Sequence, residues 1–127
     1  MLTLTFLGTS AGIPTKHRNV TALAVSLINP YSKAKNVPWL LVDCGEATQH
    51  QLLKTPLSVM QLELICITHV HGDHCYGLPG LLASMAMNGR KHPLTLIAPQ
   101  AIADYLAAVQ ATTALMISFD INFIAIE

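Results

Sequence analysis

The run from Thr68 to His74 constrains this chain more than any other feature, because it places three imidazoles and one carboxylate at the end of an apolar segment. For a chain of this composition, a chance His-x-His-x-Asp-His pattern has a probability of roughly 4 in ten thousand. Imidazole suits zinc and related first-row ions, whereas a carboxylate suits harder ions or a bridging position. The pattern therefore predicts a metal site, and a set of solvated loop histidines is the weaker alternative.

The apolar segment that precedes the run predicts how its side chains are presented. Residues 64–68 form an apolar, β-branched stretch of strand length, and an extended backbone directs alternate side chains to the same side. The glycine after the second histidine permits a sharp turn toward a neighbouring point. Two-metal sites hold their ions about 3.5–4 Å apart. The run thus predicts two ion positions, the first held by His69 and His71 and the second by Asp73 and His74.

Composition limits the class of protein. The 127 residues are enough for one domain, but a hydrophobic content of 52%, a charged content of 11% and a mean hydropathy of +0.48 are unusual for an isolated soluble domain. We expect another segment or subunit to bury part of the apolar surface. No apolar stretch is long enough for a membrane span, and residues 1–5 lack the basic start of a signal peptide, which predicts a cytoplasmic location.

The cysteines and the net charge add little. Three cysteines without zinc-finger spacing predict reduced thiols, with Cys66 in the core. A formal net charge of zero gives no global basic footprint for nucleic acid.

Hydrophobic periodicity predicts an alternation of strands and helices, and hence a layered α/β sheet in a single domain over residues 1–127. The second strand should lead into a loop around Asn29 and Pro30. We expect strands over 2–7, 21–28, 39–43, 64–68 and 94–97, helices over 46–54, 78–87 and 99–111, and one long strand or a hairpin over 116–126.

Three motifs together resemble the N-terminal part of the metallo-β-lactamase superfamily, and within it the transfer RNA 3′-processing endoribonucleases called ribonuclease Z or tRNase Z. The His-x-His-x-Asp-His element indicates only the superfamily. A Pro-x-Lys-x-Arg-Asn loop and a Gly-Leu-Pro-Gly-Leu-Leu helix start narrow the resemblance to the ribonucleases. The motifs are residues 6–19, residues 41–49 with Ala47 in place of a glycine, and residues 67–82.

The resemblance implies an αββα sandwich, of which this chain would supply roughly the N-terminal half as a mixed sheet with flanking helices. It also implies a zinc-dependent endoribonuclease, a hydrolase that removes the 3′ trailer from precursor tRNA. His69 and His71 would bind one zinc ion, and Asp73 and His74 the other, with manganese or another divalent ion as an alternative metal. Asp73 would also act as the general base.

Further site residues follow from the same resemblance. Lys16, Arg18 and Asn19 would lie near the acceptor end of the RNA, where cationic groups hold phosphates; a solvated basic loop is their alternative interpretation. Asp43 is a candidate acceptor that orients a ligating imidazole. A carboxylate that caps the next helix is an equally good interpretation of Asp43. His17, His50 and His92 have no ligand-like spacing, so we expect solvent or capping roles for them.

The family's remaining metal ligands come from sequence beyond Glu127, so the resemblance implies a domain truncated before them and inactive alone. The missing ligands would come from a C-terminal half or from a second chain in a homo-oligomer. Two alternatives remain: a hydrolase of another phosphodiester or of a sulfate ester, and a non-catalytic truncated product that self-associates. No membrane partner is expected.

Overall fold

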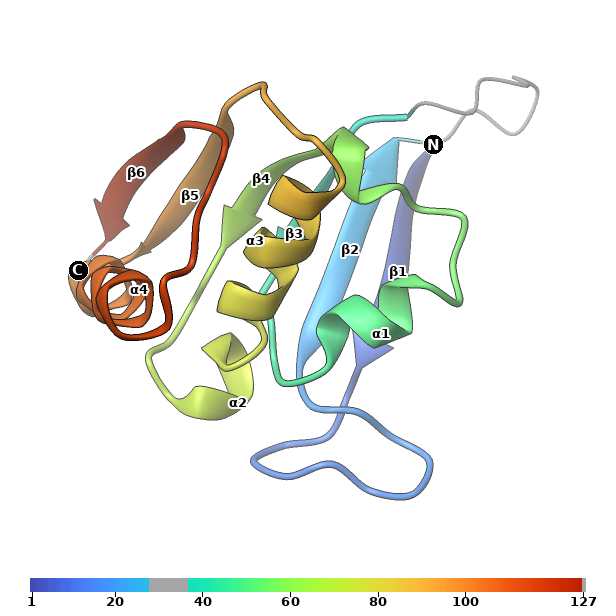
Figure 1. Cartoon of the computed structure of the whole chain (residues 1–127). Coiled ribbons are helices and arrows are strands. Elements are labelled where there is room, and N and C mark those ends of the chain that lie inside the picture. Colours follow the sequence, from blue (N-terminus) through green and yellow to red (C-terminus); the bar gives the residue numbers. More distant parts are fainter. Residues whose placement is uncertain (28–36, 127) are drawn as a thin grey trace.

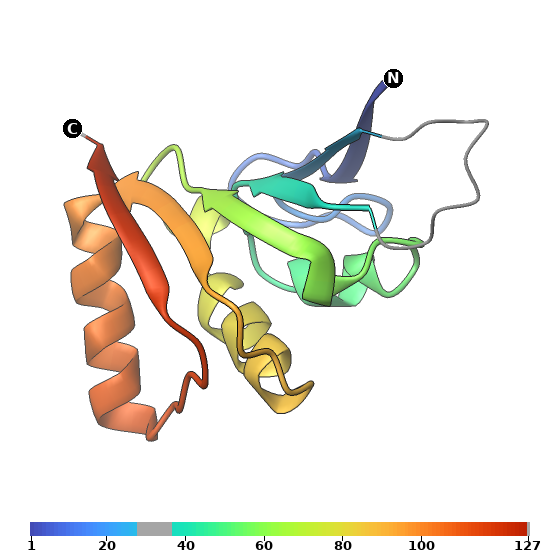
Figure 2. The ribbon, with the colours of Figure 1, turned by 90° about the horizontal axis from the view of Figure 1, so that it is seen from above.

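The computed structural model describes residues 1–27 and 37–126, which form a six-stranded mixed sheet with its helices on one face (Figures 1 and 2). The strands are β1 (Leu2–Gly8), β2 (Ala22–Leu27), β3 (Trp39–Val42), β4 (Leu62–Cys66), β5 (Leu94–Pro99) and β6 (Ile121–Ile126). The helices are α1 (Thr48–Leu52), the 3-10 turn η1 (Val59–Gln61), α2 (Gly72–Cys75), α3 (Leu78–Met87) and α4 (Gln100–Thr113). The predicted α/β class and the mixed sheet are confirmed.

The strand order β1-β2-β3-β4-β5-β6 follows the sequence. Strands β1, β2 and β3 pair antiparallel, whereas β3 to β6 pair parallel through helical crossovers. Because β3 and β4 are parallel neighbours, their carboxyl ends meet at the same edge of the sheet. Asp43 follows the first of these strands and the histidine run follows the second, so the topology brings the two motifs together.

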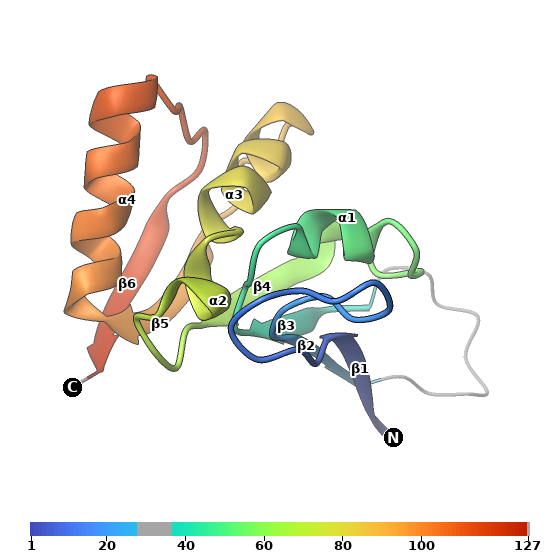
Figure 3. The same ribbon diagram turned by 90° about the horizontal axis from the view of Figure 1, so that it is seen from below.

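The core lies between the sheet and the helix layer, which Figure 3 shows from below. Alternate residues of the central strands point toward the helices, as the burial of Trp39 and Leu41 on β3 shows. Helix α3 covers them with its own apolar side, which comprises Leu78, Leu81, Leu82 and Met85. This packing fixes α3, and with it the short α2 that carries part of the candidate site.

The opposite face of the sheet is apolar, and no described element covers it. On β1 the side chains of Leu2, Leu4 and Phe6 are 62%, 52% and 66% exposed, and Leu27 at the end of β2 is 70% exposed. A contiguous apolar surface of this kind usually marks a contact with another segment or subunit. It accounts for the high mean hydropathy.

Several predicted boundaries differ from the structure. Helix α3 matches its predicted range, whereas the long strand or hairpin over 116–126 is wrong, because only 121–126 pair with β5. Residues 114–120 form a connection instead, held where Ser118 Oγ donates to the carbonyl of Arg90 and Phe119 is buried. The loop around Asn29 and Pro30 lies outside the described residues.

The burial of individual side chains differs from two predictions. Cys66 is only partly buried, while Cys44 and Cys75 are the buried thiols, so the core assignment for Cys66 is wrong. The predicted helix over 46–54 is shorter in the structure, because α1 ends at Leu52 and Leu53 is 83% exposed. Within residues 1–27 and 37–126 we find no helix with the length and hydropathy of a membrane span.

Candidate metal centre

The histidine run occupies the connection after β4 and the first residues of α2. The strand itself ends at Cys66, before the predicted end, yet His69 Nε2 still lies 2.7 Å from His71 Nδ1. The centroids of the two rings are 4.0 Å apart with the ring planes at 75°. The two exposed imidazoles are thus neighbours within hydrogen-bond distance, and their role as ligands of one ion stays a prediction.

His74 lies between two carboxylates. Its Nδ1 atom is 2.8 Å from Oδ2 of Asp43, and its Nε2 atom is 3.4 Å from Oδ2 of Asp73. A ring nitrogen that donates to a carboxylate leaves the other nitrogen with a free lone pair, which is the arrangement of a ligating histidine and its orienting carboxylate. The ring of His74 is therefore held in one orientation, with Nε2 toward Asp73.

Asp43 is a buried carboxylate with several donors. Its side chain accepts hydrogen bonds from the backbone N–H and the hydroxyl of Thr68 at 2.8 and 2.9 Å, in addition to its contact with His74. No side chain caps α1. The carboxylate thus contacts the histidine run and caps no helix, which favours the orienting role that the sequence left open.

Glycines let the two motifs approach closely. A Cβ atom on Gly45 would lie 2.5 Å from the carbonyl oxygen of Asp73, and one on Gly77 would lie 2.1 Å from that of Gly45. A backbone hydrogen bond joins the two segments directly, because Cys44 N–H donates to His74 O at 2.8 Å. A side chain at either glycine would clash with the backbone of the opposite segment.

Asp73 receives a hydrogen bond that the sequence analysis missed. The backbone N–H of Gly12 donates to Oδ2 of Asp73 across 3.1 Å, and this contact holds the pKa of the carboxyl below its usual value. Asp73 is therefore ionised at neutral pH. Gly12 has φ +76° in an exposed loop, and nothing in its residue type signalled this role.

The donor set fits divalent metal ions. When neutral His74 donates from Nδ1, the lone pair of Nε2 faces the carboxylate of Asp73, and two facing acceptors repel unless a cation lies between them or the ring is protonated. Imidazole and carboxylate together suit zinc and related ions. Within the part of the chain that the structure describes, no group of three or more His, Cys, Asp or Glu side chains is arranged to hold a metal ion. His69 contacts His71 and His74 contacts Asp73, while the ring centroids of His69 and His74 lie 5.4 Å apart, and the assignment of ligands to ions stays a prediction.

The basic loop (residues 14–19) follows Gly12, whose N–H donates to Asp73 in the candidate centre. The side-chain amide of Asn19 donates to Glu46 O at 2.8 Å and so anchors the loop to the segment before α1. Lys16 and Arg18 are exposed and line a hollow with His17. Of the other histidines, His92 lies 3.5 Å from Glu63 and His50 is exposed on α1.

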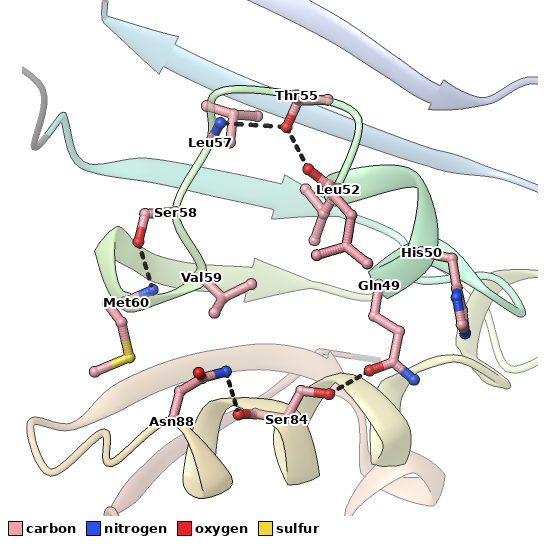
Figure 4. A pocket seen from close by; sticks show the side chains of 11 residues that line it. Gln49, His50, Leu52, Thr55, Leu57, Ser58, Val59, Met60, Ser84 and Asn88 are labelled. Carbon is pink, nitrogen blue, oxygen red and sulfur yellow. Dashed lines mark hydrogen bonds between the residues drawn. The ribbon is translucent and has the colours of Figure 1, made fainter.

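A larger hollow of about 510 Å³ lies between α1, η1 and α3 (Figure 4). Its polar side chains bond to their own surroundings: Ser84 Oγ donates to Gln49 Oε1, and the amide of Asn88 donates to Ser84 O at 2.8 Å. Among the described residues, no buried side-chain polar atom lacks a partner. The bond between Ser84 and Gln49 joins α3 to α1 at this hollow.

Comparisons with known proteins give a family, a set of relatives and a shared fold. Residues 2–115 match the family model described as "Anti-Pycsar protein Apyc1". A protein named ribonuclease Z from Pseudomonas putida is 55% identical over 124 residues, which are 98% of this chain and 37% of the relative. The chain thus spans little more than a third of the length of such curated relatives.

Solved structures extend the similarity. The human tRNase Z, short form, superposes with a TM-score of 0.81 at 33% identity, covering 98% of this chain and 45% of that chain. The metallo-β-lactamase fold protein YhfI from Bacillus subtilis superposes with a TM-score of 0.67 at 19% identity, covering 99% of this chain and 47% of that chain, which shows a shared fold.

Proposed function

Because the chain belongs to the family described as anti-Pycsar protein Apyc1 and matches the N-terminal portion of ribonuclease Z proteins, we propose that it forms part of a metal-dependent endoribonuclease that removes the 3′ trailer from precursor tRNA. The observation that carries the proposal is the convergence of ring nitrogens and carboxylates in pairs. His69 meets His71, and His74 meets Asp73 while Asp43 holds its second nitrogen. Residues 1–127 act as one domain that supplies this half of the centre.

The proposed ligands are His69 and His71 for one ion and Asp73 and His74 for the other, with zinc as the preferred metal and manganese or another divalent ion as the alternative. When bound, such ions polarise a phosphoryl oxygen and lower the pKa of an attacking water. Asp73, whose carboxyl is ionised at neutral pH, accepts the proton of that water. Asp43 keeps the Nδ1 proton of His74, so that Nε2 stays free to bind.

The basic loop holds the RNA backbone in this proposal. Lys16 and Arg18 supply cations for phosphate groups, and such contacts position nucleic acid without reading its bases. Asn19 contributes by anchoring the loop through its bond to Glu46. The loop is tied to the centre at its other end, where Gly12 donates to Asp73.

The apolar face of the sheet supports the second part of the proposal, that another segment completes the site. With Leu2, Leu4 and Phe6 on one exposed strand, this face suits the packing of a second apolar layer. A C-terminal half of the fold, or a second copy of the chain, supplies both this cover and further metal ligands. A catalytic zinc ion needs about three protein ligands, whereas the described pairs provide two each.

A cleavage assay tests the function. The 127-residue chain alone is expected to bind less than two equivalents of zinc and to leave precursor tRNA uncut, whereas a longer form with further ligands should release the trailer and leave a 3′ hydroxyl on the tRNA. In that longer form, His69→Ala should lower the zinc content by elemental analysis and abolish cleavage. His92→Ala, on an exposed histidine beside Glu63, is the matched control. Unchanged zinc content in His69→Ala would remove the ligand assignment.

One observation favours a second candidate. The family model is named for an anti-Pycsar protein and the relatives for a ribonuclease, although most of the chain matches both. A hydrolase of another phosphodiester would use the same metal ligands and phosphate contacts, and a sulfate ester hydrolase would need a similar anion site. Cleavage of a panel of such esters by the zinc-loaded protein, with precursor tRNA uncut, would favour this candidate over the ribonuclease. A non-catalytic, self-associating chain would cleave none of them.

A further inference from the structure

A small hollow lies between the basic loop and the end of α1. It has a volume of about 160 Å³ and is lined by Thr15, Lys16, His17, Arg18, Asn19, Gln51 and Lys54. Sites for drug-sized ligands are commonly about 300–1,000 Å³, so this hollow suits a single small group. Its lining includes two lysines, one arginine and one histidine, and contains no Asp or Glu.

The loop side of the hollow is a closed turn built on Thr15. The backbone N–H of Thr15 donates to Arg18 O at 2.8 Å, and the Thr15 hydroxyl oxygen accepts from the N–H groups of His17 and Arg18 at 3.3 and 2.9 Å. Asn19 then fastens the turn to Glu46. The backbone that carries Lys16 and Arg18 is thus fixed before any ligand arrives.

The helix side adds a cation that the sequence analysis did not single out. Lys54 follows α1, and its backbone N–H donates to the carbonyl of Gln51 at 3.1 Å, so both residues belong to one turn facing the loop. Gln51 offers an amide donor beside the ammonium group. Residues 15–19 and residues 51–54 lie more than thirty positions apart in sequence, and both therefore contribute donors to the same hollow.

Charge is concentrated at this point although the chain has a formal net charge of zero. Within the described ranges, the ion pairs found involve only histidines with Asp or Glu, so Lys16, Arg18 and Lys54 carry no partner carboxylate. Three unpaired cations held around a concave surface repel one another and are stabilised by an anion that they share. Phosphate oxygens accept charge-assisted hydrogen bonds from lysine and arginine, so a phosphate group suits this set of donors.

The hollow is connected to the candidate metal centre through the same loop. One end of the loop contacts Asp73 through Gly12, and the other end forms the hollow. An RNA strand whose scissile phosphate lies at Asp73 would therefore pass along the loop.

We propose that Lys54 and Gln51 join Lys16 and Arg18 in a phosphate-binding cup, which holds one backbone phosphate of the RNA away from the scissile bond. The proposal rests on the proposed function for the identity of the ligand as RNA. The chemistry that it requires of the cup is the binding of one phosphodiester group by three cations and an amide.

Salt dependence of RNA binding tests the cup. A fluorescent single-stranded RNA is titrated with the 127-residue protein in EDTA, at several salt concentrations, and binding is followed by anisotropy. For single-stranded nucleic acid, each phosphate contact contributes about 0.7 to the slope of log K against log salt. We expect Lys54→Gln to reduce the slope by about 0.7, Lys54→Arg to retain it, and Lys91→Gln, on an exposed lysine outside the hollow, to leave it unchanged.

Each outcome has a definite meaning. A slope for Lys54→Gln equal to that of the unsubstituted chain overturns the cup, as does an absence of RNA binding. If inorganic phosphate at matched ionic strength displaces the RNA at the same concentration from the unsubstituted chain and from Lys54→Gln, the anion is held elsewhere. If cleavage fails while the Lys54 effect is present, the proposed reaction fails and the cup stands; if cleavage occurs without that effect, only the cup fails.

Discussion

Nδ1 of His74 lies 2.8 Å from Oδ2 of Asp43, a residue 31 positions earlier in the sequence. The contact joins the end of β3 to α2, and it points the other ring nitrogen toward Asp73. A backbone bond from Cys44 N–H to His74 O holds the two segments at the same place. The orientation of the proposed ligand is therefore set by a carboxylate from a different motif.

Replacement of Asp43 by Asn should weaken metal binding while the fold persists. Asp43 has φ +61°, and Asn adopts this left-handed conformation readily, so the substitution removes the charge with little backbone strain. Loss of an orienting carboxylate typically costs about 10–100-fold in metal affinity. We expect a loss in this range for Asp43→Asn by competition with a zinc chelator. Asp104→Asn, on exposed α4, is the matched control, and equal affinities for the two variants would contradict the orienting role.

Replacement of Ala47 by Gly should stabilise the protein. Ala47 has φ +63° before α1, where the related motif carries a glycine. A left-handed residue with a Cβ costs roughly 1–2 kcal/mol, and glycine removes this strain at an entropic cost of about 0.4–1 kcal/mol in the unfolded chain. We therefore expect a gain of about 0.5–1 kcal/mol in urea unfolding.

The same change in a regular helix should have the opposite sign. Ala107 is exposed inside α4, where Ala107→Gly should cost about 1 kcal/mol because glycine is the weaker helix former. A destabilised Ala47→Gly protein would show that the methyl group of Ala47 makes contacts worth more than the strain.

Stability should fall at alkaline pH because of Cys44. Burial raises the pKa of this thiol from its ordinary 9.0 to about 12 in the folded protein. Above pH 9 the unfolded chain loses the proton that the folded chain retains, so the free energy of unfolding decreases by about 1.4 kcal/mol per pH unit until the folded pKa is reached. The contribution is fully present below pH 9.

The measurement compares the unsubstituted protein with Cys44→Ala. Urea unfolding at a series of pH values gives two curves, and subtraction removes the titration of the remaining groups. We expect the difference to be constant below pH 9 and to narrow above it. Parallel curves over the whole range would show that Cys44 ionises equally in both states.

Arg90 should be a major stabilising residue. Its guanidinium is fully buried and donates to the carbonyl oxygens of Leu62, His92 and Pro93 at 2.7–3.1 Å. Arg90→Met would leave these acceptors unpaired, and each such group costs about 1–3 kcal/mol. We expect a loss of about 3 kcal/mol or more in urea unfolding, compared with little change for Lys91→Met on the neighbouring exposed lysine. If Arg90→Met lost no more unfolding free energy than Lys91→Met, water would have to replace the guanidinium as the partner of these carbonyl groups.

Local patterns predicted the parts of the fold that depend on neighbouring residues. The apolar spacing of residues 78–87 gave α3 with its observed bounds, because a helix side that is buried repeats with the helical period. The spacing of His69 and His71 likewise predicted neighbouring imidazoles, which lie 2.7 Å apart between Nε2 and Nδ1. The prediction of one long strand or a hairpin over 116–126 was wrong. Part of this apolar stretch is a connection that packs on Arg90, and only residues 121–126 pair with β5.

The sequence by itself determined the α/β class, the resemblance to metallo-β-lactamase proteins and the four residues of the histidine run proposed as ligands, because these depend on residue type and short spacing. Tertiary structure alone decided that Asp43 bonds to His74 and that Gly12, 61 positions from Asp73, donates to its carboxylate. It also brought Lys54 to the basic loop. Such contacts depend on strand order and on backbone hydrogen bonds between distant segments, which no local periodicity encodes.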